Sequence, residues 1–535
     1  MIKLNIKKTV FGVMAIGLAA GMTSCNDWLG EPSPGSTELD DFFTSGEACL
    51  QTVNGCYTPL AWEYNKTYFS EWYIGDIASD DALKGGQNVA DGSDAYDIDN
   101  FKVNANNVIL LDYYRAKYQG IIRCNLAIEK IGEYELDETL TEDLKNRYLG
   151  EAYFLRGLYY FQLVRVFGGV PLIDEVLESA DKWSQPRANA ADVYAHVVKD
   201  FEEAEALLWN KSKYTEEEAG RATKGAAQAY LVKANLYNHN YDEAYKWGRK
   251  FMEEQVSTGE YSLFSDYQQN FTLAGENGAE SVFEIQYMAD PMSDYGEGNG
   301  FTRGTFTTIL TRPRQTNQGE TGWGFDHPTH NLYNEFEPGD PRREFTIGTP
   351  EEEYLDHVEV NYLGSPYYNV KTSYREQGSF PSLDHASRAP LNYRLVRLSD
   401  VMLMYAEAAL ESGKDLGAAK TMLETVRARA RAQAQGDALP AFPGYNGYSD
   451  NTDDLRAAIR HERRVELAME GHRWFDLVRW GIAYQVMDRD TGSYGANESA
   501  EARAEMAAFV PGKHELFPIP SEELNLNPME QNPGY

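Results

Sequence analysis

The densest group of side chains that could do chemistry runs from His461 to Asp476 near the C-terminus. Its acids stand beside two histidines, and such pairs can act as general acids and bases. On a helix, however, Glu462, Glu466 and Glu470 recur at steps of four and share one face, the spacing of ion pairs. The arginines within reach are Arg463, Arg464 and Arg473. We therefore predict a structural salt-bridge helix here rather than a catalytic centre.

The sequence lacks the motifs of other catalytic and cofactor sites. It has no nucleophile elbow, phosphate-binding glycine loop or dinucleotide fingerprint, and His461-Glu462 lacks the second histidine of a zinc-protease helix. A glycosidase needs two carboxylates at a set separation, but nothing among the 83 acidic residues singles out a pair. We predict a protein that is not an enzyme, with no cofactor and no metal site.

One acidic segment, residues 91–100, carries enough oxygen ligands to be considered for Ca²⁺. It lacks the residue order of an EF-hand loop and the glutamate that ends one. We favour a solvated acidic loop.

Aromatic and charged side chains also gather in two stretches without helical periodicity, at about 60–106 and 257–398. Flat rings can cover the apolar face of a ligand, while Asp and Arg bind polar groups at its edge. Inserts this long are usually functional. The candidate ligand contacts are Trp72, Tyr73, Asp80, Asp81, Tyr96, Tyr295, Phe301, Arg312, Arg314, Trp323 and Phe325. Trp323 is the leading candidate, because its flanking glycines let the backbone approach a ligand closely.

The N-terminus predicts export and a lipid anchor. Lysines precede an apolar run from Val10 to Met22, which is too short to span a bilayer and ends close to Cys25. This looks like a bacterial lipoprotein signal over residues 1–24, although Met22 stands where such signals usually carry Leu. Cys25 would be acylated and would begin a flexible, Pro- and Gly-containing tether over residues 25–40. An ordinary export signal with a chance cysteine is the alternative.

The composition predicts a folded body over residues 41–535. The chain of 535 residues has a formal net charge of −34, which argues against nucleic acid and against a basic membrane-docking face. Its charged and hydrophobic fractions are ordinary for a globular protein. Besides Cys25, the cysteines are Cys49, Cys56 and Cys124. We predict buried free thiols, with a Cys49–Cys56 bridge as the alternative because export permits it.

The body is predicted to be mainly α-helical. Its clearest helix runs from Thr141 to Phe167, where apolar residues form one stripe at steps of three and four, Thr141 can cap the start and Gly168 can end it. Further helices are predicted at about 107–131, 190–209, 222–238, 241–256, 399–412, 415–433 and 453–487, and one short strand at 281–287.

Two segments repeat a helix–turn–helix pattern, residues 226–252 and 400–431. Both are rich in alanine where paired helices would approach closely. They resemble degenerate tetratricopeptide units, which must stack on neighbours to bury their apolar faces.

The order of several short motifs resembles the SusD/RagB family of outer-membrane lipoproteins. The matching segments are Cys25 to Leu29, Glu151 to Arg156, Phe167 to Leu172, Arg221 to Ala227, Asp340 to Arg342, Leu398 to Ala408, Glu462 to Leu477 and Gln531 to Tyr535. Each is weak alone, but all of them in this order are specific, and they extend from the lipoprotein signal to the last residue.

This resemblance implies a single α-rich domain with about four tetratricopeptide-like helix pairs, whose loop-rich inserts carry the binding face. It also implies a glycan- or oligosaccharide-binding lipoprotein in the outer membrane, facing the cell exterior, with a TonB-dependent transporter as partner. Sugars suit the candidate residues, because a sugar ring has apolar C–H faces and a rim of hydroxyls. The alternative is a tetratricopeptide-type surface lipoprotein whose loops bind peptide or protein cargo.

Overall fold

The computed structural model describes residues 42–62, 70–177, 179, 182–289, 303–316, 319–350, 363, 365–375, 380–436 and 438–535. The predicted signal, the tether and Cys25 lie outside these ranges, as do Tyr295 and Phe301.

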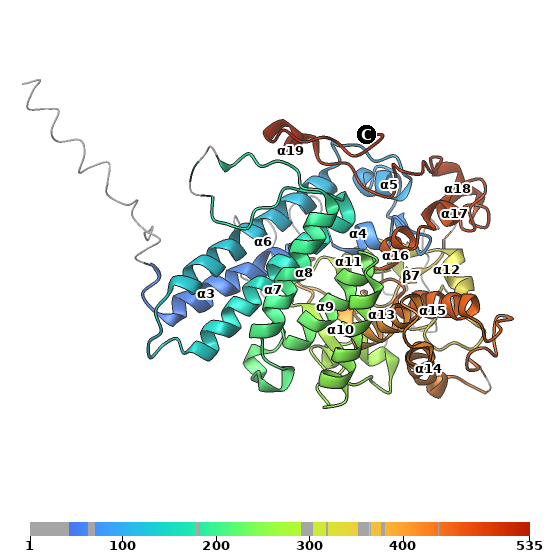
Figure 1. Ribbon diagram of the computed structural model, residues 1–535. Coiled ribbons are helices and arrows are strands. Elements are labelled where there is room, and N and C mark those ends of the chain that lie inside the picture. The colour runs from blue at the N-terminus through green and yellow to red at the C-terminus, as the bar shows by residue number, and fades with distance from the viewer. Residues whose placement is uncertain are drawn as a thin grey trace, which may run out of the picture.

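A stack of paired helices forms the scaffold. Its members are α3 (Gly46–Tyr57), α6 (Val108–Glu133), α7 (Glu142–Phe167), α8 (Ala190–Leu207), α9 (Lys224–Tyr237), α10 (Tyr241–Phe251), α13 (Leu398–Glu411), α14 (Leu416–Gln433) and α15 (Thr452–Leu467). From α6 to α10 each helix packs against the next, α10 packs against α13, and α13 packs against both α14 and α15 (Figure 1). The chain is therefore mainly α, built from tetratricopeptide-like helix pairs as predicted.

Local chemistry explains where these helices begin and how closely they pack. The side chains of Thr141 and Thr223 accept hydrogen bonds from N–H groups in the first turns of α7 and α9. Gly120 of α6 faces the ring of Tyr159 on α7, and a Cβ at Gly120 would lie 2.2 Å from that ring. Only glycine therefore allows α6 and α7 their observed separation.

One predicted helix is broken. The expected helix at 453–487 ends as α15 at Leu467 and resumes as α16 (Arg473–Arg479) and α17 (Ala483–Met487). Between them Gly471 adopts φ +77°, and its N–H donates to both carboxylate oxygens of Asp76 at 2.9 and 3.0 Å. The apolar periodicity of the sequence continues through this segment, but the helix does not. The Gly471 N–H bonds to the buried Asp76 carboxylate instead of to a carbonyl of the helix.

The remaining elements are short. They are the helices α4 (Trp72–Gly75), α5 (Ser93–Asp99), α11 (Thr307–Thr311), α12 (His330–Glu335), α18 (Ala500–Glu505) and α19 (Ser521–Leu526), with single turns η1 (Thr58–Ala61), η3 (Lys211–Lys213), η4 (Glu216–Glu218), η5 (Met252–Val256), η6 (Tyr267–Phe271) and η7 (Leu273–Gly275). In Figure 1, α5 and α12 lie at the side of the helical stack.

The second insert contains more strands than its sequence predicts. Antiparallel pairs join β2 (Ser281–Ile285) to β8 (Tyr393–Arg397), β1 (Ala82–Gly85) to β5 (Phe325–Pro328), β3 (Gln315–Thr316) to β4 (Gly319–Glu320), and β6 (Ile347–Gly348) to β7 (Tyr368–Asn369). Every residue of β1, β2, β5 and β8 is buried, so these strands show no alternation of polar and apolar residues. The β1–β5 pair joins the two inserts to each other.

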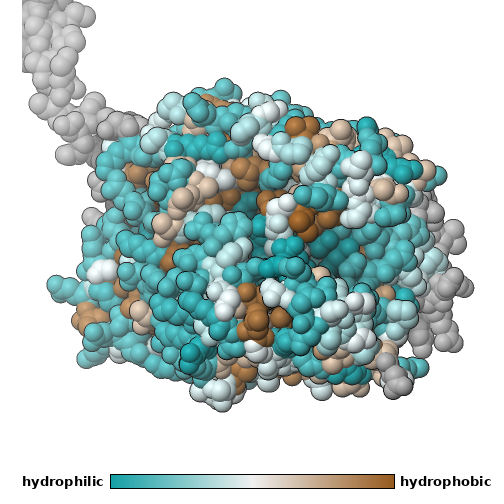
Figure 2. Space-filling view, turned by 45° about the vertical axis from the view of Figure 1, so that its right-hand side comes forward, coloured by the Kyte–Doolittle hydropathy of each residue, from teal (hydrophilic) through white to brown (hydrophobic). Residues whose placement is uncertain are grey.

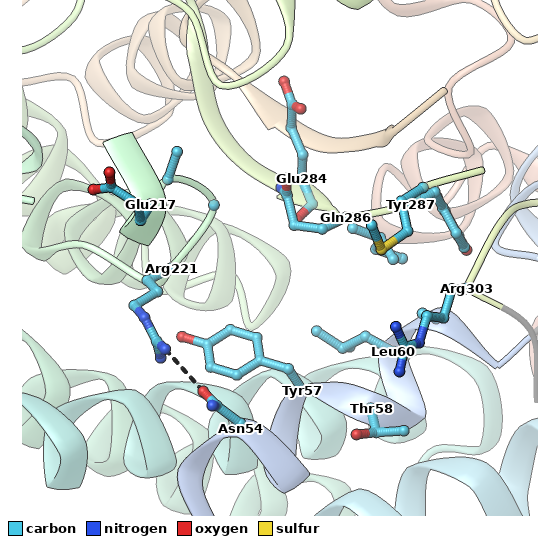
Figure 3. Close-up of a pocket in the computed structure, with 15 residues that line it drawn as sticks. Asn54, Tyr57, Thr58, Leu60, Glu217, Arg221, Glu284, Gln286, Tyr287 and Arg303 are labelled. Atoms are coloured by element: carbon cyan, nitrogen blue, oxygen red, sulfur yellow. Dashed lines mark hydrogen bonds between the residues drawn. The ribbon is translucent and has the colours of Figure 1, made fainter. Parts of the chain in front are cut away.

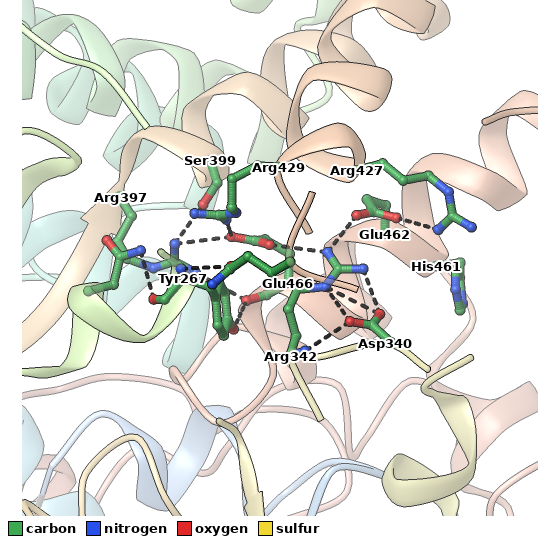
Figure 4. Close-up of polar contacts among 12 residues, drawn as sticks. Tyr267, Asp340, Arg342, Arg397, Ser399, Arg427, Arg429, His461, Glu462 and Glu466 are labelled. Atoms are coloured by element: carbon green, nitrogen blue, oxygen red, sulfur yellow. Dashed lines mark hydrogen bonds and ion pairs between the residues drawn. The ribbon is translucent and has the colours of Figure 1, made fainter. Parts of the chain in front are cut away.

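Buried ion pairs attach α15 to the surrounding elements (Figure 4). Arg342 donates to Glu462 at 2.5 Å and to Glu466 at 3.1 Å. Arg397 of β8 and Arg429 of α14 also pair with Glu466, at 3.1 and 2.5 Å. Burial alone would raise the pKa of Glu466, but these three guanidinium groups hold it well below its usual range.

The prediction of a structural ion-pair helix is thus confirmed, but the predicted partners are wrong. Arg463 pairs with Asp400 and Asp476, Arg464 with Asp81, and Arg473 with Asp80. The acids of α15 instead take arginines from distant segments.

The three cysteines after the tether are buried free thiols, as predicted. No helix of the described residues is long and apolar enough to cross a membrane. The face drawn in Figure 2 is mostly hydrophilic, with hydrophobic residues in small separate groups.

We expect Glu466→Gln to lower the free energy of unfolding by about 3–5 kcal/mol, because it leaves three buried guanidinium groups without their shared charge. Urea denaturation followed by circular dichroism measures this loss. The matched control is Glu243→Gln, which removes an exposed i, i+3 pair with Lys246 and should leave the urea midpoint unchanged. Equal effects of the two substitutions would contradict the role assigned to Glu466.

Candidate functional site

The two inserts meet at a cavity of about 400 Å³, here called the Trp323 pocket. Its lining comes from α4, from α5 and the loop before it, from the start of α6, and from the segment between the start of α11 and β5. The lining residues are Tyr73, Asp91, Gly92, Asp94, Ala95, Ile109, Leu310, Arg314, Trp323 and Phe325. The pocket therefore combines three aromatic rings with charged groups, in the size range of small-molecule sites.

Glycines at the β1–β5 junction hold one wall of the Trp323 pocket. Gly85 pairs with Phe325 in the sheet register, and the N–H of Gly86 donates to the carbonyl of Gly324. A Cβ at Gly86 or at Gly92 would lie about 3 Å from the ring of Phe325. The absence of side chains at Gly86 and Gly92 thus makes room for the Phe325 ring.

The aromatic wall is supported from behind. The Trp323 N–H donates to the carbonyl of Ile309 at 2.8 Å, and its side chain remains partly exposed. Tyr73 stacks on Trp72 with ring centroids 3.9 Å apart, and Trp72 Nε1 donates to Thr307 Oγ1 at 3.1 Å. Trp72 is fully buried and is a support for Tyr73 rather than a part of the lining.

The charged rim is also held in place. Arg314 Nη2 donates to Asp91 Oδ2 at 2.8 Å and to the Trp323 carbonyl at 2.7 Å. Behind the rim, Lys84 Nζ donates to the carbonyls of Asn88 and Asp91, and burial lowers the pKa of Lys84 to about 8. Asp94 Oδ1 accepts the N–H of Val108 at 3.0 Å. The rim groups therefore need little ordering when a ligand binds.

Four of the predicted contacts lie together in this lining: Tyr73, Arg314, Trp323 and Phe325. The other described candidates lie outside this lining and are bonded to protein partners. Asp80 binds Arg473 at 2.7 and 2.9 Å, and although burial opposes ionisation, the charges of Arg464 and Arg473 lower the pKa of Asp80 to about 2. Asp81 pairs with Arg464 at 2.8 Å.

Tyr96 and Arg312 also lie outside the lining and are hydrogen-bonded within the protein. Arg312 is buried and donates to the carbonyls of Ser373, Pro381 and Tyr374, each at 2.9 Å. Tyr96 is buried and hydrogen-bonded to Glu505 and Lys102.

Sequence reasoning missed Asp91 and Asp94 as lining residues, although it singled out their segment for its oxygen content. The prediction of a solvated acidic loop is wrong for residues 93–99, which form α5, and Asp99 is buried with its carboxylate accepting the Lys84 N–H at 2.9 Å. Among the described residues no group of His, Cys, Asp or Glu is arranged to hold a metal ion.

A second and larger cavity, about 510 Å³, is here called the Tyr57 pocket. It lies between the end of α3, the turn before α9 and the continuation of β2 (Figure 3). Its lining comprises Asn54, Tyr57, Thr58, Leu60, Ala61, Glu217, Ala219, Gly220, Arg221, residues 284–288 and Arg303. It shares no lining residue with the Trp323 pocket.

Three buried carboxyl groups, those of Asp76, Asp81 and Asp326, interact electrostatically where β1 pairs with β5. Burial raises the pKa of each, and for Asp326 to about 7. The charges of Asp81 and Asp326 raise the pKa of Asp76 further. Asn369 Nδ2 donates to Asp326 Oδ2 at 2.7 Å, which partly offsets the cost of burying the charge.

Family models match most of the chain in two parts. The model of the SusD family matches residues 279–535, and a model described as "Starch-binding associating with outer membrane" matches residues 23–236. The SusD-like protein P38 of Formosa agariphila is 26% identical over 511 residues, which cover 90% of this chain and 93% of that protein.

Solved structures share the fold. A laminarin-binding SusD-like protein is 28% identical with a TM-score of 0.74, covering 91% of this chain and 99% of that chain. Surface glycan-binding protein A from Bacteroides uniformis is 25% identical with a TM-score of 0.74, over 91% of this chain and 99% of that chain.

We expect Asp326→Asn to stabilise the protein more at neutral than at acidic pH. The pKa of Asp326 is raised in the folded state above its ordinary value of 3.8, so the folded chain binds the proton more tightly. This carboxyl therefore lowers the free energy of unfolding as the pH rises from about 4 to about 7. Asparagine keeps the bond with Asn369 as an amide pair and removes the charge.

The measurement is a pair of urea denaturation curves at about pH 5 and about pH 7. The difference in free energy of unfolding between Asp326→Asn and wild type should grow with pH. The control is Asp490→Asn at an exposed turn, for which this difference should not grow. A difference that is constant over this range would show that Asp326 is ionised throughout.

Proposed function

We propose that this chain, which belongs to the SusD family, is a surface glycan-binding protein without catalytic activity. One observation carries the proposal: Tyr73, Trp323 and Phe325 line an open cavity whose rim holds Asp91, Asp94 and Arg314. Two of the similar solved structures are named for binding laminarin or glycan.

The pocket suits a sugar because it offers both surfaces that a sugar ring needs. An aromatic ring can cover an apolar C–H face, while carboxylate and guanidinium groups bond to hydroxyls at the edge. Trp323 is the partly exposed ring of the three, and the other two are buried parts of the wall. Weak contacts of this kind suit a protein that must release what it captures.

The charges at the pocket favour a neutral glycan over an acidic one. Two carboxylates, Asp91 and Asp94, share the rim with one guanidinium, and Arg314 is already bound to Asp91. The whole chain adds a net charge of −34, which repels anionic polymers at a distance. Glycans rich in uronic acid or sulfate should therefore bind less well than neutral ones.

The proposal includes a place and a partner. We propose that residues 1–24 are an export signal, that the lipidated tether 25–40 anchors the single domain 41–535, and that the protein faces outward from the outer membrane. The description of one matching family model, which mentions association with the outer membrane, supports this placement. A TonB-dependent transporter would take up the glycan that this protein captures.

We expect Trp323→Ala to weaken glycan binding about tenfold or more, a change of about 1.4 kcal/mol. The thermal midpoint should change little, because the ring is partly exposed. Affinity electrophoresis and calorimetry would use laminarin together with a panel of other neutral and of uronic-acid polysaccharides. Trp183, whose side chain is 65% exposed and outside the pocket, supplies the matched control Trp183→Ala.

Several outcomes of this experiment would contradict the proposal. A large loss of stability with unchanged affinity would make Trp323 a core residue. Binding of peptides with no binding to any glycan would favour peptide cargo, and release of reducing sugar by the pure protein would show an enzyme. Preference for uronic-acid polysaccharides would contradict the charge argument alone.

We expect Cys25→Ala to move the protein from the membrane fraction to the soluble fraction, since acyl chains on this residue would supply the anchor. Fractionation and immunoblotting of cells that express either form measure the distribution. Cys49→Ala, a change at a buried free thiol within the body, is the control. Retention of the Cys25 variant in membranes would contradict lipidation.

A further inference from the structure

We propose that the Tyr57 pocket is a second carbohydrate-binding site, separate from the Trp323 pocket. The inference rests on the proposed function, because it assumes that the protein handles glycans. The cavity is larger than the Trp323 pocket, about 510 against about 400 Å³, and it lies between scaffold helices and the end of β2.

Tyr57 provides the aromatic surface of this second site. Its hydroxyl donates to Glu151 Oε2 at 2.7 Å and accepts the N–H of Ala222 at 2.9 Å, so both ends of the side chain are fixed. Figure 3 shows the ring between Arg221 and Leu60, with Gln286 and Tyr287 on the opposite wall. A ring held in this way can stack on a sugar without loss of rotamer freedom.

Planar polar groups surround this ring. Arg221 donates to Glu151 at 2.9 Å and to Asn54 Oδ1 at 2.8 Å, which sets the orientation of the guanidinium and of the amide. On the opposite wall, the Gln286 amide is bonded to Asn277 at 2.8 and 3.0 Å. Amides and guanidinium groups in fixed positions are the usual partners of sugar hydroxyls.

Two other classes of ligand fit the Tyr57 pocket less well. An added peptide strand would need free main-chain donors along β2, but the N–H groups of Tyr287 and Met288 already donate to Asn392 Oδ1 and to the Arg303 carbonyl, each at 2.8 Å. The lining carries two acids, Glu217 and Glu284, and two arginines, Arg221 and Arg303. Arg221 is already paired with Glu151, so the pocket offers an anionic ligand no excess of positive charge. A neutral molecule rich in hydroxyls meets neither obstacle.

The two pockets can be blocked independently, because they share no lining residue. Ala219 is exposed in the turn before α9 and lines the Tyr57 pocket, so Ala219→Trp would fill the cavity without entering the core. Ala500→Trp places the same side chain on the exposed start of α18 and is the matched control. Circular dichroism melting verifies that each variant folds.

The test is calorimetric titration with laminarin, and with short oligosaccharides of any other polysaccharide bound in the panel. We expect two binding events in the wild type. The Trp323→Ala variant should keep one of them, and adding Ala219→Trp to that variant should weaken the remaining event at least tenfold. Ala500→Trp in the same background should leave that residual event unchanged.

The outcomes separate this inference from the proposed function. A single event that Trp323→Ala abolishes and Ala219→Trp leaves intact would overturn the second site and keep the function. A residual event with the same affinity in the Trp323→Ala variant and in the Trp323→Ala, Ala219→Trp double variant would lie outside the Tyr57 pocket and would overturn the inference. Absence of binding to every glycan would overturn both.

Discussion

Four buried arginines, Arg342, Arg397, Arg427 and Arg429, pair with Glu462 or Glu466 of α15. Each of these charges is tolerable there only because another is beside it. Glu466 alone joins Arg342 of the second insert, Arg397 of β8 and Arg429 of α14. Moving any of these segments would leave a buried charge without its partner. The position of the second insert on the helical stack is therefore set by charge as well as by apolar packing. The position of the Trp323 pocket, which this insert helps to line, depends on the same ion pairs.

The helical part of the fold could be predicted from sequence because its signals are local. The apolar stripe from Thr141 to Phe167 and the helix cap at Thr141 can be recognised from neighbouring residues alone. The structure contains α7 at the predicted position. The break after Leu467 could not be predicted in this way, because the Asp76 carboxylate that binds Gly471 is distant in the chain. The strands β1, β5 and β8 are buried on both faces and carry no alternating pattern to recognise.

The site shows the same division. Trp323 could be selected because glycines flank it, and the cavity does include it. The sequence could not show which of the neighbours Trp72 and Tyr73 lines the pocket. That difference appears only in the structure, where Trp72 stacks behind Tyr73. Asp80 and Asp81 have the composition of ligand contacts, but Arg464 and Arg473, distant in the chain, bind their carboxylates. The kinds of side chain that line a pocket could therefore be predicted. Which candidate side chains are instead bound by residues distant in the chain could not.

The stack of Tyr73 on Trp72 divides the wall of the Trp323 pocket into an inner layer and an outer one. Trp72 is buried and bonded to Thr307 of α11, whereas Trp323 and Arg314 line the Trp323 pocket. Under the proposed function, substitutions in the outer layer can alter what is bound while the inner layer continues to hold the inserts together. A protein built in this way can change its ligand over evolutionary time in small steps, without first losing its fold.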